Sequence, residues 1–362
     1  MKMKFKPLLY RLMLYNSDWM EKIRLFALII PFLSVIITYL ICYLNQQHHN
    51  FYFLSQYTTD KEKDNNNYKL HIGLMAVPFQ PKRTKNLQSV WGNKFTTDSA
   101  FGGFNIMRTN LSLPQGYINL DYPPDMKEYM ESLPTISKFW NERDRFWVSN
   151  SMQYDLSIKL ISQINYFIHN TSANWFLRIT DDVFINTFAI NNLLRNLNEN
   201  MKIDPMNDFF IGGHCLDYVK EPLLQGGSGF IFTRAAAKKF LPNMKEWVRT
   251  VDYYEDWHFA RSFPKLGWPI YNSTLPEFLG LAPRKSHRFF VNHGLSKLFP
   301  KCPSEPPPLM FCKRVMPRIV DTIVWHDHKS YYETVDWFNF VNQAPDDLYW
   351  YQNGEFPSLC RK

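Results

Sequence analysis

The sequence has little charge for its length, since Asp, Glu, Lys and Arg together make up only 20% of its 362 residues. Hydrophobic residues make up 45% and aromatic residues 17%, which excludes a wholly disordered chain. The formal net charge of +8 could suggest a nucleic-acid-binding protein. However, about half of this excess lies in residues 1–24, and the rest forms no basic stripe. We therefore expect no nucleic-acid partner.

The catalytic motifs of several enzyme classes are missing. The chain contains no G-x-S-x-G, no G-x-x-x-x-G-K, no H-E-x-x-H and no C-x-x-C. The signals for a nucleophile-elbow hydrolase, a phosphate-loop nucleotidase, a zinc peptidase of that class and a dithiol redox enzyme are therefore absent. No internal repeat is present either. Any catalytic site must come from less regular clusters of polar residues.

Residues 25–44 form an uncharged apolar run, long enough for about 30 Å of helix. A buried core helix is less favoured so near a terminus, and a cleaved signal peptide is disfavoured because the run lacks a small-x-small cleavage site. Basic residues are frequent before the run and absent from residues 45–60. We therefore predict a cytoplasmic tail at 1–24, a signal anchor at 25–44 and a luminal remainder. The polar segment 45–68 is expected to be a solvated stem.

Sequons and cysteines agree with a luminal location. Three Asn-x-Ser/Thr sequons begin at Asn110, Asn170 and Asn272. An even number of cysteines, which suits an oxidising compartment, follows the anchor: Cys215, Cys302, Cys312 and Cys360. Four cysteines allow three pairings, and the sequence does not choose among them.

Short apolar runs alternate with helical spacing in the luminal part. The runs at 70–79 and 175–179 are typical of buried strands, and the apolar residues of 155–169 fall on one helical face. This alternation predicts an α/β domain over 69–345 with a largely parallel central sheet, and a C-terminal tail at 346–362. Further strands are expected at 146–150 and 208–213, and a further helix at 188–197.

Four clusters of polar residues lie at the ends of these expected elements. In WFLRITDDVFIN, Asp181 and Asp182 directly follow a strand, where paired acids favour a divalent cation with a phosphate, although one of them could instead cap a helix. In QGGSGF (225–230), the adjacent glycines permit close approach of a ligand or form an ordinary turn. In YYEDWHF (253–259), the acids among aromatic residues could include a general base or only a helix-dipole partner. In TIVWHDH (322–328), a histidine could bind a metal.

In this order, the clusters resemble the motifs of the fringe-like glycosyltransferases of family 31, which include β1,3-galactosyl- and β1,3-N-acetylglucosaminyltransferases. WFLRITDDVFIN is similar to W-F-x-K-A-D-D-D-T-Y-V, QGGSGFIFTRAAAKKF to G-G-A-G-Y-V-L-S, EDWHFARSFPKLG to E-D-V-x-x-G-x-C-x-x-x-L-G, and TIVWHDH to (I/V)-S-F-H-Y. KRTKNLQSVWGNKF (82–95) resembles the family's early Arg-containing helix. The resemblance implies a GT-A nucleotide-sugar fold, a manganese ion, a UDP-sugar donor and a single-pass type II protein of the Golgi or endoplasmic reticulum membrane.

The same resemblance assigns roles by position. Asp182 and His326 match the family's metal ligands, and His328 is the less favoured alternative to His326. Asp256 matches the catalytic base. The positions that match the donor-binding residues are Arg83, Arg178, Asp181, Gly226 and Gly227.

Three residues depart from the family pattern. Thr180 stands in place of the first acid of the triplet, Trp257 in place of the usual Val, and Ala260 in place of the usual Gly. The function implied is inverting transfer of a hexose or N-acetylhexosamine, with β1,3-linked galactose or N-acetylglucosamine expected, from a UDP-sugar to a glycan or glycoprotein acceptor. The alternative is a catalytically inactive luminal protein on the same fold that binds sugars or acts as a chaperone, and Thr180 motivates it.

Overall fold

The computed structural model divides the chain into two compact units, Met1–Asn65 and Asn66–Lys362. The structure describes residues 33, 34, 36–38, 69–76, 83, 84, 87, 91, 92, 94, 101–107, 117–120, 150–218, 221–249, 255–268, 273–275, 278–281, 301–304, 316–326, 340, 341, 344–353 and 356–362.

Of the expected anchor at 25–44, the structure describes residues 33, 34 and 36–38, which are helical and exposed. Over the described part of the chain, no helix has both the length and the hydropathy that crossing a bilayer requires. The rest of the expected anchor and the stem at 45–68 lie outside the described residues. The membrane anchor therefore stays a prediction.

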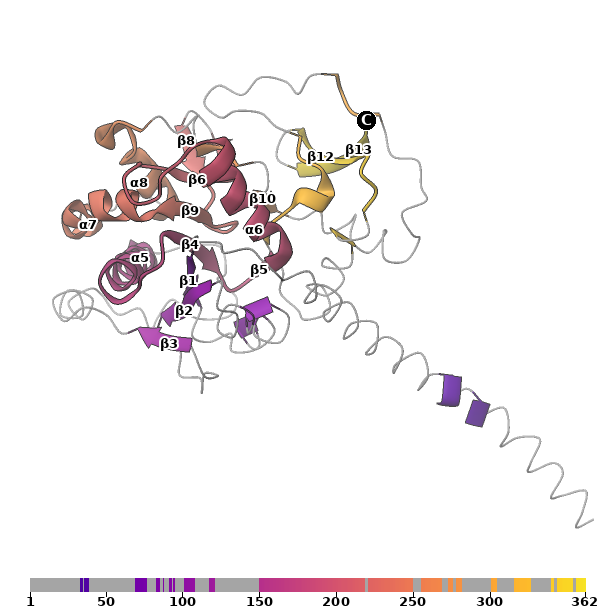
Figure 1. Ribbon diagram of the computed structural model, residues 1–362, viewed down its shortest axis with the longest axis horizontal. Helices are drawn as coiled ribbons and strands as arrows, with labels where there is room; N and C mark the ends of the chain where they lie inside the picture. Colours follow the sequence, from indigo (N-terminus) through magenta and orange to yellow (C-terminus); the bar gives the residue numbers. More distant parts are fainter. Residues whose placement is uncertain are drawn as a thin grey trace, which may run out of the picture. The chain divides into compact units, whose positions relative to one another are not determined.

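A six-stranded sheet organises the second unit, in the order β3-β2-β1-β4-β9-β6 (Figure 1). Its strands are β1 (Leu70–Met75), β2 (Phe101–Met107), β3 (Tyr117–Leu120), β4 (Trp175–Thr180), β6 (Ile211–Gly213) and β9 (Phe230–Thr233). The strands β3, β2, β1 and β4 are parallel neighbours, whereas β9 runs antiparallel to both β4 and β6. The α/β class is confirmed, with one reversed strand inside a largely parallel sheet.

Helices cover both faces of this sheet. On one face, the long helix α5 (Asn150–Asn170) packs with α7 (Arg234–Arg249) and α8 (Glu255–Arg261). On the other face, α6 (Thr187–Arg195) and β10 (Phe278–Leu281) belong to one hydrophobic cluster with β1, β4 and β9. Several apolar residues of α5, such as Ile164 and Phe167, are fully buried. Each such side chain contributes roughly 1.5–3 kcal/mol through burial.

Two of the expected elements are present with shifted boundaries, and a third lies almost entirely outside the described residues. The strand expected at 146–150 does not reach its last residue, because Asn150 already begins α5; residues 146–149 lie outside the described part. The strand expected at 208–213 is confined to β6. The helix expected at 188–197 begins one residue earlier as α6 and continues into a π-helical turn at Asn196–Asn200.

The segment expected to be a C-terminal tail, 346–362, contains an antiparallel hairpin of β12 (Leu348–Asn353) and β13 (Phe356–Arg361). Leu348, Trp350 and Leu359 are buried against Trp325, which is why this segment is ordered and not a solvated tail. A disulfide joins Cys302 to Cys360 in β13. This is one of the pairings that the sequence left open. Cys215 is disulfide-bonded as well.

Candidate functional site

The paired acids lie at the carboxyl end of the central strand β4. Thr180 is the last residue of β4, and Asp181 and Asp182 form the turn that leads into β5 (Val183–Ile185). In an open α/β sheet, ligands bind beyond this end of the strands. Asp181 is buried, with an exposed fraction of 1%, whereas the side chain of Asp182 is 14% exposed. Asp182 is therefore the carboxylate that a ligand can reach more easily.

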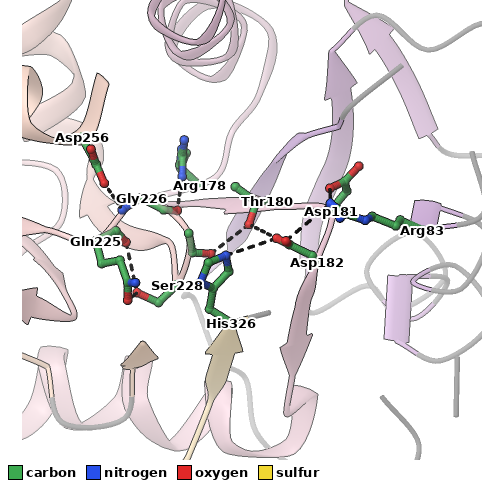
Figure 2. A network of polar contacts seen from close by, with 11 residues as sticks. Arg83, Arg178, Thr180, Asp181, Asp182, Gln225, Gly226, Ser228, Asp256 and His326 are labelled. Carbon is green, nitrogen blue, oxygen red and sulfur yellow. Dashed lines mark hydrogen bonds and ion pairs between the residues drawn. The ribbon is translucent and has the colours of Figure 1, made fainter. Parts of the chain in front are cut away.

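A second sheet brings the late histidine to these acids. The strand β11 (Val324–His326) pairs antiparallel with β5, and His326 lies opposite Val183. This register places His326 Nε2 3.4 Å from Asp182 Oδ1 (Figure 2). His326 Nδ1 is buried and has no hydrogen-bond partner among the described residues. The ring therefore makes its polar contact through Nε2.

Arg83 lies on the other side of the acid pair. Its Nη1 donates to Asp181 Oδ1 at 3.3 Å and to Asp182 Oδ2 at 3.4 Å. Burial opposes ionisation of Asp182, but the hydrogen bond and charge of His326, followed by Arg83 and Thr180, outweigh it and hold the pKa of Asp182 well below its usual range. Asp182 is thus deprotonated at any ordinary pH, as a carboxylate that binds a cation must be.

The adjacent glycines of QGGSGF, Gly226 and Gly227, lie in a turn between the acid pair and α8 (Figure 2). Arg178, which is buried, donates from Nη1 to the carbonyl of Gly226. The N–H of Gly226 donates to Asp256 Oδ2 at 2.9 Å. Asp256, at the start of α8, thus contacts the N–H of the same glycine whose carbonyl accepts from Arg178 (Figure 2).

At position 227, only glycine fits beside the ring of His326. A Cβ added at Gly227 would lie 2.3 Å from His326 Cε1 and 2.5 Å from Nε2, closer than real contacts allow. Gly229 closes the same turn with φ of +77°, and an added Cβ there would lie 2.4 Å from the carbonyl oxygen of Arg178. The turn therefore needs glycine for space at one position and for backbone conformation at the other.

Thr180 connects this turn to the acid pair. Its Oγ1 lies 2.9 Å from Asp182 Oδ1 and 2.9 Å from the carbonyl oxygen of Gly227. Sequence reasoning identified Thr180 only as a departure from a family pattern. Nothing in the sequence indicates that its hydroxyl reaches a glycine 47 residues away.

Every residue selected from the sequence for the site is in the described part and belongs to this one set of contacts, except His328, which lies outside the described residues. The sequons at Asn110 and Asn272 and the cysteine Cys312 also lie outside the described residues. Sequence reasoning missed His214, whose Nδ1 lies 3.1 Å from the carbonyl oxygen of Phe278. Burial lowers the pKa of His214 to about 4, although the Phe278 carbonyl acts in the opposite direction. The roles given to the selected residues stay predictions.

The fit of a divalent cation depends on its ligands. Within the described part of the chain, no three His, Cys, Asp or Glu side chains gather closely enough to hold a metal by themselves. Asp182 Oδ1 and His326 Nε2, at 3.4 Å, have the spacing of two neighbouring ligands of one ion. Mg²⁺-like ions often use one or two protein ligands together with substrate phosphates. The residues therefore fit a cation that arrives with a diphosphate.

No family model matches the chain. It is similar at low identity to two solved glycosyltransferase structures. One, involved in glycosylation of the major capsid of PBCV-1, is 12% identical with a TM-score of 0.35, covering 75% of this chain and 99% of that one. The other, the galactosyltransferase LgtC in complex with donor and acceptor sugar analogues, is 12% identical with a TM-score of 0.39, covering 76% and 98%. At this distance, the case for a function rests on the residues of the site.

Proposed function

We propose that this protein is a metal-dependent glycosyltransferase that uses a UDP-sugar donor. The observation that supports it most is the convergence of Asp182, His326 and Asp256 on the Gly226–Gly227 turn, at the carboxyl end of the central strand. In the proposed mechanism, a cation offsets the charge on the departing diphosphate and a separate carboxylate accepts the proton of the acceptor, and both groups lie beside one turn. In finer detail, we propose a GT-A fold of the family 31 type.

Asp182 and His326 are the residues that would hold the cation, with Asp181 and Arg83 behind them. When bound, a manganese ion supplies positive charge that offsets the negative charge developing on the departing diphosphate. Arg83 and Arg178 contribute further positive charge from the protein, and a guanidinium suits a phosphate better than a lysine does. Gly226 and Gly227 are proposed to contact the donor through their backbone. Their missing side chains leave the space that Asp256, Arg178 and His326 occupy.

Asp256 is proposed as the general base. The acceptor hydroxyl attacks the anomeric carbon, its proton passes to Asp256, and the bond from that carbon to the diphosphate oxygen breaks. A single base acting on the face opposite the leaving group inverts the sugar carbon, as in inverting glycosidases. The hydrogen bond from Gly226 N–H to Oδ2 fixes the carboxylate before the acceptor arrives.

The acceptor is proposed to be a glycan or glycoprotein of the secretory pathway, and the product a β1,3-linked galactose or N-acetylglucosamine. This location requires the anchor at 25–44 to place the second unit in the lumen. Asn170 is the last residue of α5 and is exposed, so its sequon is accessible to glycosylation. Cells expressing the full chain should yield a glycosidase-sensitive mass that Asn170→Gln reduces, and an unglycosylated product would contradict the location.

The direct test uses the purified full-length chain with manganese and a panel of UDP-sugars. We expect manganese-dependent release of UDP from one donor, and manganese-dependent thermal stabilisation by UDP. The alternative of an inactive sugar-binding protein, which Thr180 motivates, predicts sugar binding without UDP release from any donor. A chain that shows no binding of UDP with manganese would contradict the proposed function.

A further inference from the structure

We propose that Thr180 is a positioning residue that couples the cation-binding carboxylate to the turn that holds the general base. This inference rests on the proposed function, because it concerns the same site. Thr180 Oγ1 lies 2.9 Å from both Asp182 Oδ1 and the carbonyl oxygen of Gly227. These two acceptors belong to the two halves of the site.

A hydroxyl group has one proton, and both of these neighbours are acceptors that cannot donate when Asp182 is ionised. Thr180 can therefore donate to only one of them at a time. The carboxylate is the stronger acceptor, because hydrogen bonds to charged groups are stronger than those to neutral groups. Without a cation, the hydroxyl proton should point toward Asp182, and the Gly227 carbonyl should compete poorly.

Charge compensation at Asp182 changes this balance. When the negative charge of Asp182 is shared with a cation, its pull on the hydroxyl proton weakens, and the proton can turn to the Gly227 carbonyl. Cation binding and fixation of the glycine turn should therefore support each other, which is a coupling free energy between two positions.

The Gly226–Gly227 turn links Thr180 to the proposed base, Asp256. Gly227 follows Gly226 directly, and the N–H of Gly226 donates to Asp256 Oδ2 at 2.9 Å. Arg178 holds the carbonyl of Gly226 from the opposite side, so the turn has little freedom to tilt. An acid at position 180 would bring a further negative charge beside Asp182. A threonine instead provides a hydroxyl that can serve either acceptor.

The test compares Thr180→Val, which removes the hydroxyl at similar size, with Thr180→Ser, which keeps it. The matched control is Thr171→Val, because Thr171 also uses its hydroxyl in hydrogen bonds, donating to the Phe167 carbonyl and accepting from Arg234 at the end of α5. The measurements on the full-length chain are manganese affinity, by titration with and without UDP, and UDP affinity with and without manganese.

We expect Thr180→Val to lower manganese affinity about 10- to 100-fold, the usual effect of removing a group that orients a metal ligand. We expect Thr180→Ser to stay within about threefold of the wild type. The factor by which UDP and manganese strengthen each other should shrink in Thr180→Val. Thr171→Val should lower the unfolding temperature and leave both affinities unchanged.

Two failures are distinguishable. Suppose that the wild-type chain binds manganese with UDP. If Thr180→Val then binds both equally well, or if Thr180→Ser binds as weakly as Thr180→Val, the proposed role of Thr180 is wrong and the proposed function stands. If the wild-type chain binds neither, both proposals are wrong. Should Thr180→Val fail to fold, Thr180→Ala takes its place, with the same expected loss of manganese affinity.

Discussion

His326 Nε2 lies 3.4 Å from Asp182 Oδ1, because β11 pairs with β5 in a register that sets His326 opposite Val183, the residue after Asp182. A single backbone pairing thus brings together two residues far apart in the chain. The contact is possible only because Gly227 leaves space for the imidazole ring.

We expect Asp182→Asn to abolish manganese-dependent binding of UDP, because the change removes the negative charge and retains the shape of the side chain. Asp181→Asn should have a smaller effect, since Asp181 is buried and less accessible to a ligand. Isothermal titration with manganese and UDP measures both. Equal UDP affinity with and without manganese in the wild-type chain would contradict the assignment of Asp182.

We expect Asp256→Asn to leave UDP and manganese binding nearly unchanged while it removes transfer. A general base acts only in the transition state, and its loss typically lowers turnover by about 10²- to 10⁴-fold. Glu255→Gln, at the neighbouring residue of α8, is the matched control and should retain turnover. If Asp256→Asn keeps turnover but weakens donor binding, Asp256 is a structural acid of the turn.

Gly227→Ala should weaken manganese binding, because the added methyl group would displace the His326 ring from Asp182. A double-mutant cycle with His326→Ala tests this cause directly. Once the ring is absent, Gly227→Ala should have little further effect on manganese affinity. Additive effects of the two substitutions would show that the glycine acts through some other contact.

Arg234→Met should destabilise the fold by about 3 kcal/mol or more in the free energy of unfolding. The buried guanidinium donates to the carbonyls of Phe167, Ile168, Thr171 and Ala173, and these acceptors at the end of α5 would lose their partner. Lys238→Met, on the exposed side of the same helix, is the control and should have little effect. Chemical denaturation of the full-length chain measures the difference.

His214 should make stability depend on pH between about 6.5 and 4. Burial lowers the pKa of His214 to about 4 in the folded state, whereas the unfolded chain binds the proton near pH 6.5. The unfolded state therefore gains protons first, and stability present above pH 6.5 is lost as the pH falls toward 4. The slope of unfolding temperature against pH should flatten in His214→Gln; an unchanged slope would assign it to other groups.

Much of the fold could be predicted from the sequence. The helical spacing of α5 and the apolar run of β4 fix those elements locally, because their burial follows from which side chains are apolar. The C-terminal hairpin was missed, since β12 and β13 alternate weakly and depend on packing against Trp325 and on the disulfide to Cys302. The antiparallel direction of β9 was also not predictable, because strand direction is set by the chain path between strands.

The sequence by itself determined which residue types are available at the site: paired acids after a strand, adjacent glycines, an acid at a helix start and a late histidine. The tertiary structure decided how they are connected. Strand register placed His326 beside Asp182, the Gly226 N–H reached Asp256, and the Thr180 hydroxyl joined the two halves. These contacts join residues distant in sequence, and a hydrogen bond depends on ångström-scale geometry that only the packed sheets and turns provide.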